Sequence, residues 1–220
     1  MARYGVIFDM DGVLVDSYRA HFDSWNRMAA SHGLSVTEQQ FAATFGRTTR
    51  EIIKVLWPGR ASDEEIPAWD DEKEQAYRDI LQESFPEMPG AAALLEALHE
   101  GGFALAIGSS GPPENVAVVR TCLPDLFDAA VTADDVTHGK PHPEVFLKAS
   151  MKMQVRPERC AVVEDAPAGV AAARAAGMAA IAITGTAPWD ALARQAHLVI
   201  DALTDLTPER IGELIDSQAP

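Results

Sequence analysis

The sequence predicts an α/β protein with a Rossmann-like parallel sheet as its core and a small all-α helical cap domain inserted after the first strand. Two observations predict the sheet: short apolar segments recur along the chain, and helical segments lie between them. Strands that are continuously apolar and alternate with helices are typical of parallel sheets covered on both faces. A third observation predicts the cap, because residues 17–84 have helical periodicity throughout and contain no strand-like run.

The expected elements of the core alternate along the chain. Strands are expected at 4–8, 103–108, 129–132, 160–163, 179–184 and 198–200. Core helices are expected at 91–100, 113–122, 143–153, 166–176 and 207–216. Gly101 and Gly177 follow two of these helices, and Pro208 stands in the first turn of the last one. Glycine after a helix and proline at its start are the usual signals for these boundaries.

Residues 17–84 are expected to form the cap, so that the core comprises residues 1–16 and 85–220. Cap helices are expected at 18–31, 37–44, 48–56 and 64–83. The segment has enough aromatic residues for a small core of its own: Phe22, Trp25, Phe41, Phe45, Trp57, Trp69 and Tyr77. A turn-like segment at 86–90 closes it. The alternative is that these helices pack directly on the sheet.

The composition is that of a folded protein with a strongly acidic surface. Of the 220 residues 47% are hydrophobic and 23% are charged, which suits one domain or one core with a modest insertion and excludes a disordered chain. Acidic residues number 33 and basic residues 18, which gives a net charge of −15. Such a surface repels phosphate backbones and anionic lipid, so we expect neither a nucleic-acid nor a membrane partner.

We expect neither a signal peptide nor a membrane span in this sequence. Its first apolar run is short and ends at Asp9, and no stretch approaches the roughly 20 apolar residues that a span needs. The two cysteines, Cys122 and Cys160, lie far apart and predict neither a disulfide framework nor a zinc site. We expect a cytoplasmic protein that is a monomer or a small homo-oligomer.

Two carboxylates follow the first expected strand, in the sequence Asp9-Met10-Asp11-Gly12. Ligands of parallel α/β sheets gather at the carboxyl ends of the strands. The two side chains point differently where the strand becomes a loop, so that one can attack a substrate while the other transfers protons. A calcium loop begins in the same way, but its twelfth position, which needs an acid, would be Ala20. An Asx turn with helix capping is the other structural alternative.

Polar groups are also expected where later strands end. The segment Ser109-Ser110-Gly111 offers hydroxyls and open backbone amides that suit a phosphate, although a plain polar turn has the same composition. Lys140 lies between loop-forming residues ahead of a helix. It is either a fixed countercharge or one more solvated lysine.

Glu164 and Asp165 end the expected strand at 160–163. Two adjacent acids after a buried strand need a cation to neutralise them, unless they only cap the helix that follows. Acids at two strand ends, a hydroxyl and a lysine on the same sheet edge predict a site for a metal ion and a phosphate. Because all these ligands are oxygens, a hard cation such as Mg²⁺ is favoured over zinc.

These four motifs resemble those of the haloacid dehalogenase-like (HAD) hydrolase superfamily, in its branch of β-phosphoglucomutase-like and small-metabolite phosphatase-like proteins with a helical cap. The resemblance covers essentially the whole chain, and the motifs occur in the family's order. It implies that Asp9 is the nucleophile that forms an aspartyl-phosphate. It also implies that Asp11 protonates the leaving oxygen and then activates water.

The resemblance further implies the surroundings of the phosphoryl group. Ser109 would hydrogen-bond that group, and Lys140 would balance its charge. Mg²⁺ would be held by the Asp9 carboxylate, the main-chain oxygen of Asp11 and Asp165, with Glu164 nearby as a support or an occasional ligand. A proton donor at position 11 favours phosphoryl transfer over dehalogenation, because cleavage of a carbon–halogen bond needs no proton for the leaving group.

Substrate-binding residues are expected in the loop after 103–108 and in the cap: Ser110, Gly111, His21, Gly46, Arg47, Thr48, Arg50 and Lys73. His21 and Trp25 are four residues apart and share a helix face. Trp25 is interpreted as cap core, and His21 as a site or hinge residue. Lys73 matches a cap lysine of the mutase group, or is paired on a helix surface.

The cap loop departs from the mutase pattern. In β-phosphoglucomutase an arginine of this loop binds the remote phosphate, and the ungapped match to it here is Thr49, with arginines instead at 47 and 50. The sequence therefore predicts a magnesium-dependent phosphatase for a small phosphorylated sugar, polyol or glycolate-type acid, its small-molecule partner. A hexose phosphomutase that uses the same aspartyl-phosphate is the alternative. A non-catalytic phosphometabolite-binding protein is the third hypothesis, although no catalytic position is degraded.

Overall fold

The computed structural model describes residues 4–44 and 47–218. The chain divides into two compact units. One unit comprises Met1–Asp16 and Glu87–Pro220, and the other comprises Ser17–Pro86. The helical segment therefore ends two residues later than the expected boundary at 84.

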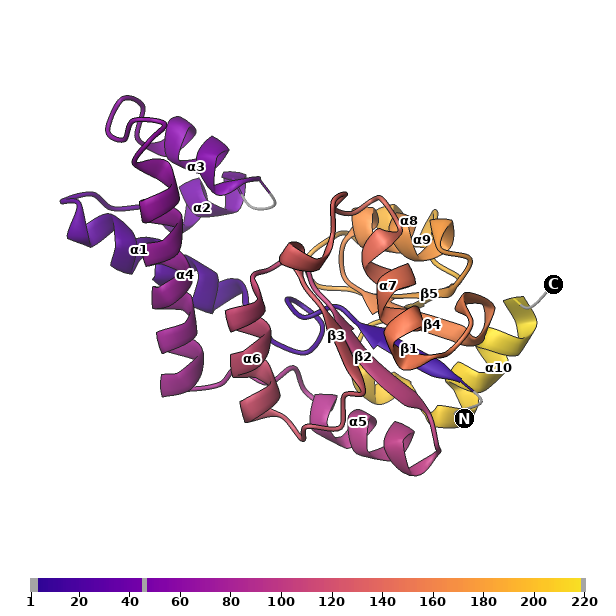
Figure 1. Ribbon diagram of the computed structural model, residues 1–220. Coiled ribbons are helices and arrows are strands. Elements are labelled where there is room, and N and C mark those ends of the chain that lie inside the picture. Colours follow the sequence, from indigo (N-terminus) through magenta and orange to yellow (C-terminus); the bar gives the residue numbers. More distant parts are fainter. Residues whose placement is uncertain (1–3, 45–46, 219–220) are drawn as a thin grey trace. The chain divides into compact units, whose positions relative to one another are not determined.

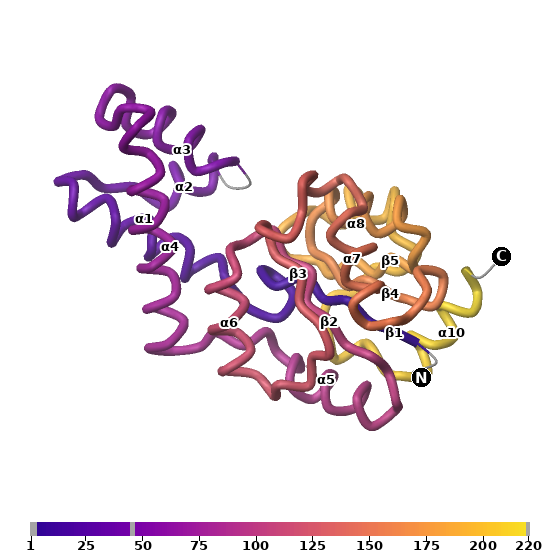
Figure 2. Tube along the Cα trace, in the orientation of Figure 1, coloured from indigo at the N-terminus to yellow at the C-terminus, as the bar shows by residue number. Residues whose placement is uncertain are grey.

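The first unit is built on a six-stranded, wholly parallel sheet (Figure 1). Its strands are β1 (Gly5–Phe8), β2 (Ala104–Gly108), β3 (Ala129–Val131), β4 (Cys160–Glu164), β5 (Ala179–Ile183) and β6 (Leu198–Ile200). The strand order is β3-β2-β1-β4-β5-β6, so β1 (indigo in Figure 2) lies between β2 and β4. Along the chain, β2 and β3 are added on one side of β1, and β4, β5 and β6 are added on its other side.

Helices pack against both faces of this sheet. The helices of this unit are α5 (Ala91–Glu100), α6 (Pro113–Cys122), α7 (Glu144–Met153), α8 (Pro167–Ala175), α9 (Trp189–Ala193) and α10 (Pro208–Gln218). On one face, α7 and α8 form a buried apolar cluster with Ile7, Ala106 and Val162 of the central strands. Because successive residues of a strand point to opposite faces of the sheet, the residues next to these three face the other side. On the other face α5 contacts β2, and α10 contacts β4 and β5.

The predicted α/β fold class is confirmed, and each expected strand agrees with an observed one to within one residue at either end. The apolar runs were readable because all five residues of β2, β4 and β5 are buried. The short helix α9 was not predicted from the sequence, and neither were the 3₁₀ turns Ala133–Asp135, Pro157–Arg159 and Leu203–Asp205. Such single turns are too short to have a detectable hydrophobic period.

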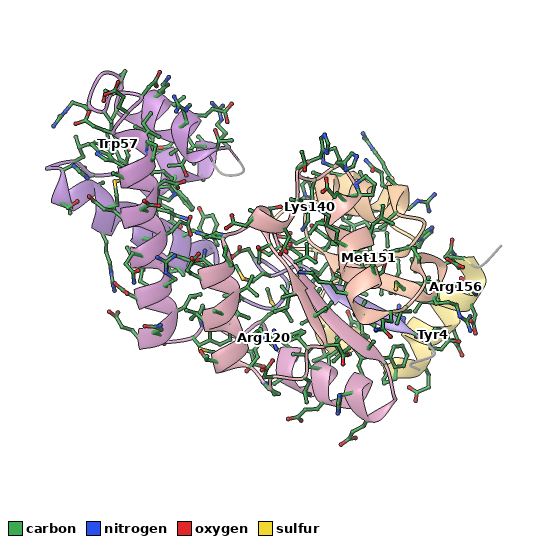
Figure 3. All side chains as sticks on the ribbon, in the orientation of Figure 1. Tyr4, Trp57, Arg120, Lys140, Met151 and Arg156 are labelled. Atoms are coloured by element: carbon green, nitrogen blue, oxygen red, sulfur yellow. The ribbon has the colours of Figure 1, made fainter. Side chains whose placement is uncertain are left out.

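The second unit consists of α1 (Tyr18–Ser31), α2 (Glu38–Thr44), α3 (Thr49–Leu56) and α4 (Ile66–Glu83). It has an apolar core of its own, in which Trp25, Phe41, Trp57 and Trp69 are buried; Trp57 is labelled in Figure 3. The interpretation of Trp25 as a core residue therefore agrees with its 3% exposure. Within the described residues, no helix has both the length and the apolar character required to cross a membrane.

Candidate active site

Three carboxylates meet where the central strands β1 and β4 end. Asp9 directly follows β1, Glu164 is the last residue of β4, and Asp165 comes next. The two strands are paired, and the Asp9 backbone N–H donates to the carbonyl of Val163 at 2.9 Å. Oxygens of the three carboxylates lie within 4.8 Å of one another. Between β1 and β4 the strand order changes direction, which is where open α/β sheets bind their ligands.

Lys140 is the cation of this cluster (Figure 3). Its Nζ donates to Asp9 Oδ1 at 2.5 Å, to Glu164 Oε1 at 2.8 Å and to the carbonyl oxygen of Gly108 at 3.1 Å. Gly108 ends β2, so this one ammonium connects the ends of three adjacent strands. The side chain is only 9% exposed, which excludes the alternative of a solvated lysine.

The cluster has more negative charge than Lys140 neutralises. Burial raises the pKa of Asp9 well above its usual value, and Glu164 and Asp165 raise it further although Lys140 lowers it. Burial and the neighbouring Glu164 raise the pKa of Asp165 from 3.8 to about 7. Burial alone would lower the pKa of Lys140, but Asp9 and Glu164 raise it above its ordinary range. Three buried carboxylates beside one ammonium therefore fit a divalent cation, and their oxygens suit a hard one.

Glu164 differs from the other two acids because donors occupy both of its oxygens. Its Oε1 accepts from Lys140, and its Oε2 accepts from the backbone N–H groups of Asp165 at 2.9 Å and Ala166 at 2.8 Å. The carboxylate also lies so close to Gly169 of α8 that a Cβ at that position would collide with it. The backbone N–H groups directly after β4 thus fix the Glu164 carboxylate, which in turn supports Lys140.

Asp11 lies in a tight loop directly after β1. The loop is closed by hydrogen bonds from the N–H of Gly12 to the carbonyl of Val15 at 2.8 Å and from the N–H of Leu14 to the carbonyl of Met10 at 2.9 Å. Gly12 has φ +74°, and a Cβ there would collide with the Asp165 carboxylate. Only glycine therefore permits this approach. Asp11 is close enough to contribute to the raised pKa of Asp165.

The segment 109–111 continues the same edge of the sheet. Ser109 follows β2, which is the other neighbour of β1, and is 2% exposed. Its backbone N–H donates to the carbonyl of Val131, and its Oγ accepts from the N–H of Gly111 at 3.0 Å. Ser110 is exposed. The Ser109 hydroxyl retains its own proton for donation to a further acceptor.

One residue of this edge, Thr186, was not predicted from the sequence. Thr186, in the loop after β5, hydrogen-bonds the Asp165 carboxylate through its side chain and thereby lowers the pKa of that carboxyl. Its hydroxyl oxygen is 3.1 Å from the place that a Cβ of Gly12 would take. The sequence could have indicated Thr186 by its position, because it lies two residues beyond the expected strand at 179–184, at the same edge of the sheet.

In the helical unit, the structure brings together two of the expected substrate-binding residues. The Nζ of Lys73 lies 3.1 Å from Nδ1 of His21 and 2.6 Å from Oε1 of Glu74. The His21 ring is stacked on Tyr77 at 4.1 Å between ring centroids. Of the alternative that Lys73 is paired on a helix surface, the pairing is observed, with Glu74, but the surface position is wrong, because Lys73 is 5% exposed. The burial of Lys73 could not be predicted from the sequence, because acids on both sides of a lysine, here Glu72 and Glu74, are typical of a solvated helix face.

The remaining cap candidates are at the start of α3 and before it. Arg47 and Arg50 are exposed, and Arg50 forms an ion pair with Asp63 at 2.7 Å. Thr48 caps α3: its side chain accepts from the N–H of Glu51, whose carboxylate accepts from the N–H of Thr48 in return. Gly46 lies outside the described residues.

Comparison with known proteins identifies the class of protein. A family model for the haloacid dehalogenase-like hydrolases matches residues 5–177. Fructose-1-phosphate phosphatase YqaB of Escherichia coli (strain K12) is 34% identical over 180 residues, which are 81% of this chain and 96% of that protein. Hexitol phosphatase A of the same organism is 34% identical over 208 residues, 92% of this chain and 93% of that one. The crystal structure of β-phosphoglucomutase from Clostridium difficile matches with a TM-score of 0.80 at 26% identity, covering 99% and 98% of the two chains.

The chain belongs to the haloacid dehalogenase-like hydrolase family. Within that family it is similar to the branch that contains β-phosphoglucomutase and phosphatases of small phosphorylated compounds, and this predicted resemblance is confirmed. The prediction of an enzyme of the hydrolase class is confirmed with it, and the named relatives support phosphatase activity. The family in general uses a divalent metal ion, which agrees with the acidic cluster of Asp9, Glu164 and Asp165.

Proposed function

We propose that this protein is a magnesium-dependent phosphatase that hydrolyses a small phosphorylated sugar, polyol or glycolate-type acid through an aspartyl-phosphate on Asp9. One observation carries the proposal: the Asp9 carboxylate is buried, bonded to Lys140 and placed beside Asp165 at the β1–β4 junction. The proposed nucleophile thus pairs with a fixed cation and has a proposed metal ligand within 4.8 Å of it. The similarity to sugar and hexitol phosphatases supports the substrate class.

In the first step the Asp9 carboxylate attacks phosphorus. An acyl phosphate bond forms while the bond from phosphorus to the ester oxygen breaks, and Asp11 gives its proton to the departing oxygen. In the second step Asp11 removes a proton from water, which attacks the phosphorus of the aspartyl-phosphate and releases inorganic phosphate. Dividing a very slow hydrolysis into two transfers is the general advantage of covalent catalysis.

Lys140 and Ser109 stabilise the negative charge on the oxygens of the phosphoryl group during its transfer. The Lys140 ammonium is held against Asp9 by Glu164, so that it needs no rearrangement when negative charge develops on the phosphoryl oxygens. The buried Ser109 hydroxyl donates its free proton to one of those oxygens. Fixed donors in a site removed from water contribute more than the same groups contribute in solvent.

The residues that would hold Mg²⁺ are Asp9, Asp165 and the main-chain oxygen of Asp11. Glu164 is the support in this arrangement, because its Oε1 holds the Lys140 ammonium that also contacts Asp9. When bound, Mg²⁺ supplies positive charge that neutralises the phosphoryl oxygens. Thr186 orients the Asp165 carboxylate for this role through its hydrogen bond.

The helical unit, residues 17–86, is proposed as the cap domain that selects the substrate. Its buried Lys73 and the neighbouring His21 are the candidate contacts for the substrate's polar groups. The exposed Arg47 and Arg50 are the candidates for a second anionic group. Specificity for one phosphorylated metabolite would then depend on residues outside the sheet edge that performs the chemistry.

Measurement of phosphate release from a panel of phosphorylated sugars, polyols and small acids tests the function. We expect turnover of at least one of these in Mg²⁺, loss of turnover in excess EDTA and recovery when Mg²⁺ is restored. Binding of these compounds without any turnover across the panel would contradict an enzymatic role. It would favour a phosphometabolite-binding protein instead.

A phosphomutase is the second candidate, and the structural match to β-phosphoglucomutase over nearly the whole chain supports it. Incubation with β-glucose 1-phosphate separates the two functions. Formation of glucose 6-phosphate without net loss of esterified phosphate would identify the mutase. Release of inorganic phosphate supports the phosphatase.

Asp11→Asn is expected to remove most of the turnover, because the leaving oxygen then receives no proton and water is not activated. Loss of a positioned acid–base group typically costs about 10²–10⁴-fold. Substrates with good leaving groups, such as p-nitrophenyl phosphate, should still form the adduct, detectable by intact-protein mass spectrometry of acid-quenched samples. Full activity in the variant would disprove the assignment of Asp11.

A further inference from the structure

A second cluster of metal-ligating side chains lies near the loop that presents Lys140. It consists of His138, His142 and Glu144, whose ligand atoms lie within 4.8 Å of one another. None of them belongs to the cluster at Asp9. Both imidazoles are exposed, while the Glu144 side chain is 16% exposed. No step of the proposed phosphatase reaction uses these residues.

The spacing of the three ligand atoms resembles that of a four-coordinate metal site. Glu144 Oε2 lies 3.1 Å from Nδ1 of His138 and 4.0 Å from Nδ1 of His142. The two ring centroids are 4.7 Å apart. Ligand bonds of about 2.0–2.1 Å in a tetrahedron place neighbouring ligand atoms about 3.3 Å apart. Small rotations of two exposed side chains therefore bring all three atoms to one ion.

The Glu144 carboxylate is oriented by donors to both of its oxygens. Lys148 Nζ lies 2.6 Å from Glu144 Oε1, which also accepts from the backbone N–H of Thr137 at 3.1 Å. The backbone N–H of His138 donates to Oε2 at 3.0 Å. These contacts, Lys148 foremost, lower the pKa of Glu144 to about 2, so the carboxylate is ionised. Hydrogen-bond donors of this kind orient a metal-ligating carboxylate.

The backbone holds the two histidines on one tight turn. The N–H of His142 donates to the carbonyl of Gly139 at 3.0 Å, and the chain enters α7 two residues later, at Glu144. The turn thus fixes where both imidazoles are attached relative to the carboxylate. Because the loop is short and hydrogen-bonded, little backbone entropy remains to be lost when an ion binds.

We propose that His138, His142 and Glu144 form a second cation site, which takes a transition-metal ion such as Zn²⁺ or Co²⁺ and leaves a fourth position to water. Two imidazoles and one carboxylate suit zinc and its neighbours, whereas Mg²⁺ prefers oxygen ligands only. The site is therefore chemically distinct from the all-oxygen cluster at Asp9. The net charge of −15 attracts cations to the protein in general.

Titration of the full-length protein with Co²⁺ in the presence of saturating Mg²⁺ tests the proposal. We expect one Co²⁺ per chain with the visible absorption bands of four-coordinate cobalt, and displacement of that ion by Zn²⁺. His138→Ala and His142→Ala should each weaken binding by about tenfold or more, the loss typical of disturbing even an outer partner of a metal ligand. His99→Ala, which removes another exposed histidine, is the matched control and should change nothing.

The variant Asp165→Asn distinguishes this site from the acidic one. The affinity for Co²⁺ and the visible spectrum of the bound Co²⁺ should be unchanged in this variant if the histidines hold the ion. Three results would overturn the proposal: no saturable Co²⁺ binding in excess Mg²⁺, equal binding by wild type and the two histidine variants, or loss of the cobalt spectrum with Asp165→Asn. Failure of the phosphatase proposal would leave this outcome unaffected, because cobalt binding is measured without substrate.

Discussion

Asp9→Asn is expected to reduce kcat by at least about 10⁴-fold while the protein remains folded. An amide cannot form the acyl phosphate, and loss of a covalent nucleophile typically removes this much rate or more. The fold is retained because Lys140 keeps its ion pair with Glu164 at 2.8 Å. Removal of one of three buried carboxylates also relieves repulsion, which is what raises the pKa of Asp9 in addition to burial.

The measurement compares phosphate release and thermal unfolding for wild type, Asp9→Asn and the control Asp16→Asn. Asp16 is exposed near the end of the same loop, so its substitution changes the charge equally without entering the cluster. We expect the control to retain activity. Residual turnover of Asp9→Asn close to that of wild type would remove Asp9 from its role as nucleophile.

Lys140→Ala is expected to abolish turnover and also to destabilise the protein by about 3 kcal/mol, since removing one partner of a buried ion pair leaves uncompensated charge. Asp9 and Glu164, 8% and 2% exposed, would both lose their ammonium. The destabilisation should be measured by urea unfolding without divalent cations. Lys152→Ala is the matched control: Lys152 pairs with Asp135 in a more exposed position, where such pairs contribute about 1 kcal/mol or less.

A double variant separates the charge effect from the loss of packing. In the Lys140→Ala background, Asp9→Asn should recover part of the lost stability, because it removes one of the unpaired carboxylates. In the wild-type background the same substitution removes an ion pair. If Asp9→Asn destabilised both backgrounds equally, the two side chains would not be coupled and the assigned geometry would be wrong.

Much of the fold was readable from the sequence because its strands are buried along their whole length. Every residue of β1, β2, β4 and β5 is buried, so each appears as an unbroken apolar run that ends at a polar or glycine residue. The helical unit was readable because residues 17–84 have helical periodicity throughout and contain no strand-like run. Single turns such as Ala133–Asp135 carry no such period and were missed.

The sequence also identified which polar residues stand at strand ends, but it did not determine which strands are neighbours. Asp9, Lys140 and Asp165 are candidates by residue type and position alone. Their meeting depends on the order β3-β2-β1-β4-β5-β6, which places β4 beside β1 although about 150 residues separate them. Strand order is set by long-range packing of the crossover helices, and local sequence does not record it.

By itself the sequence determined the α/β class, indicated the helical insertion, and supplied the acids, the hydroxyl and the lysine that are the candidate site residues. Only the tertiary structure decided what each of these groups contacts. It distinguished Glu164, whose two oxygens are occupied by Lys140 and backbone N–H groups, from the adjacent Asp165, and it revealed Thr186 and the burial of Lys73. The physical reason is that burial and hydrogen bonding depend on neighbours in space, whereas residue type and periodicity are properties of the chain alone.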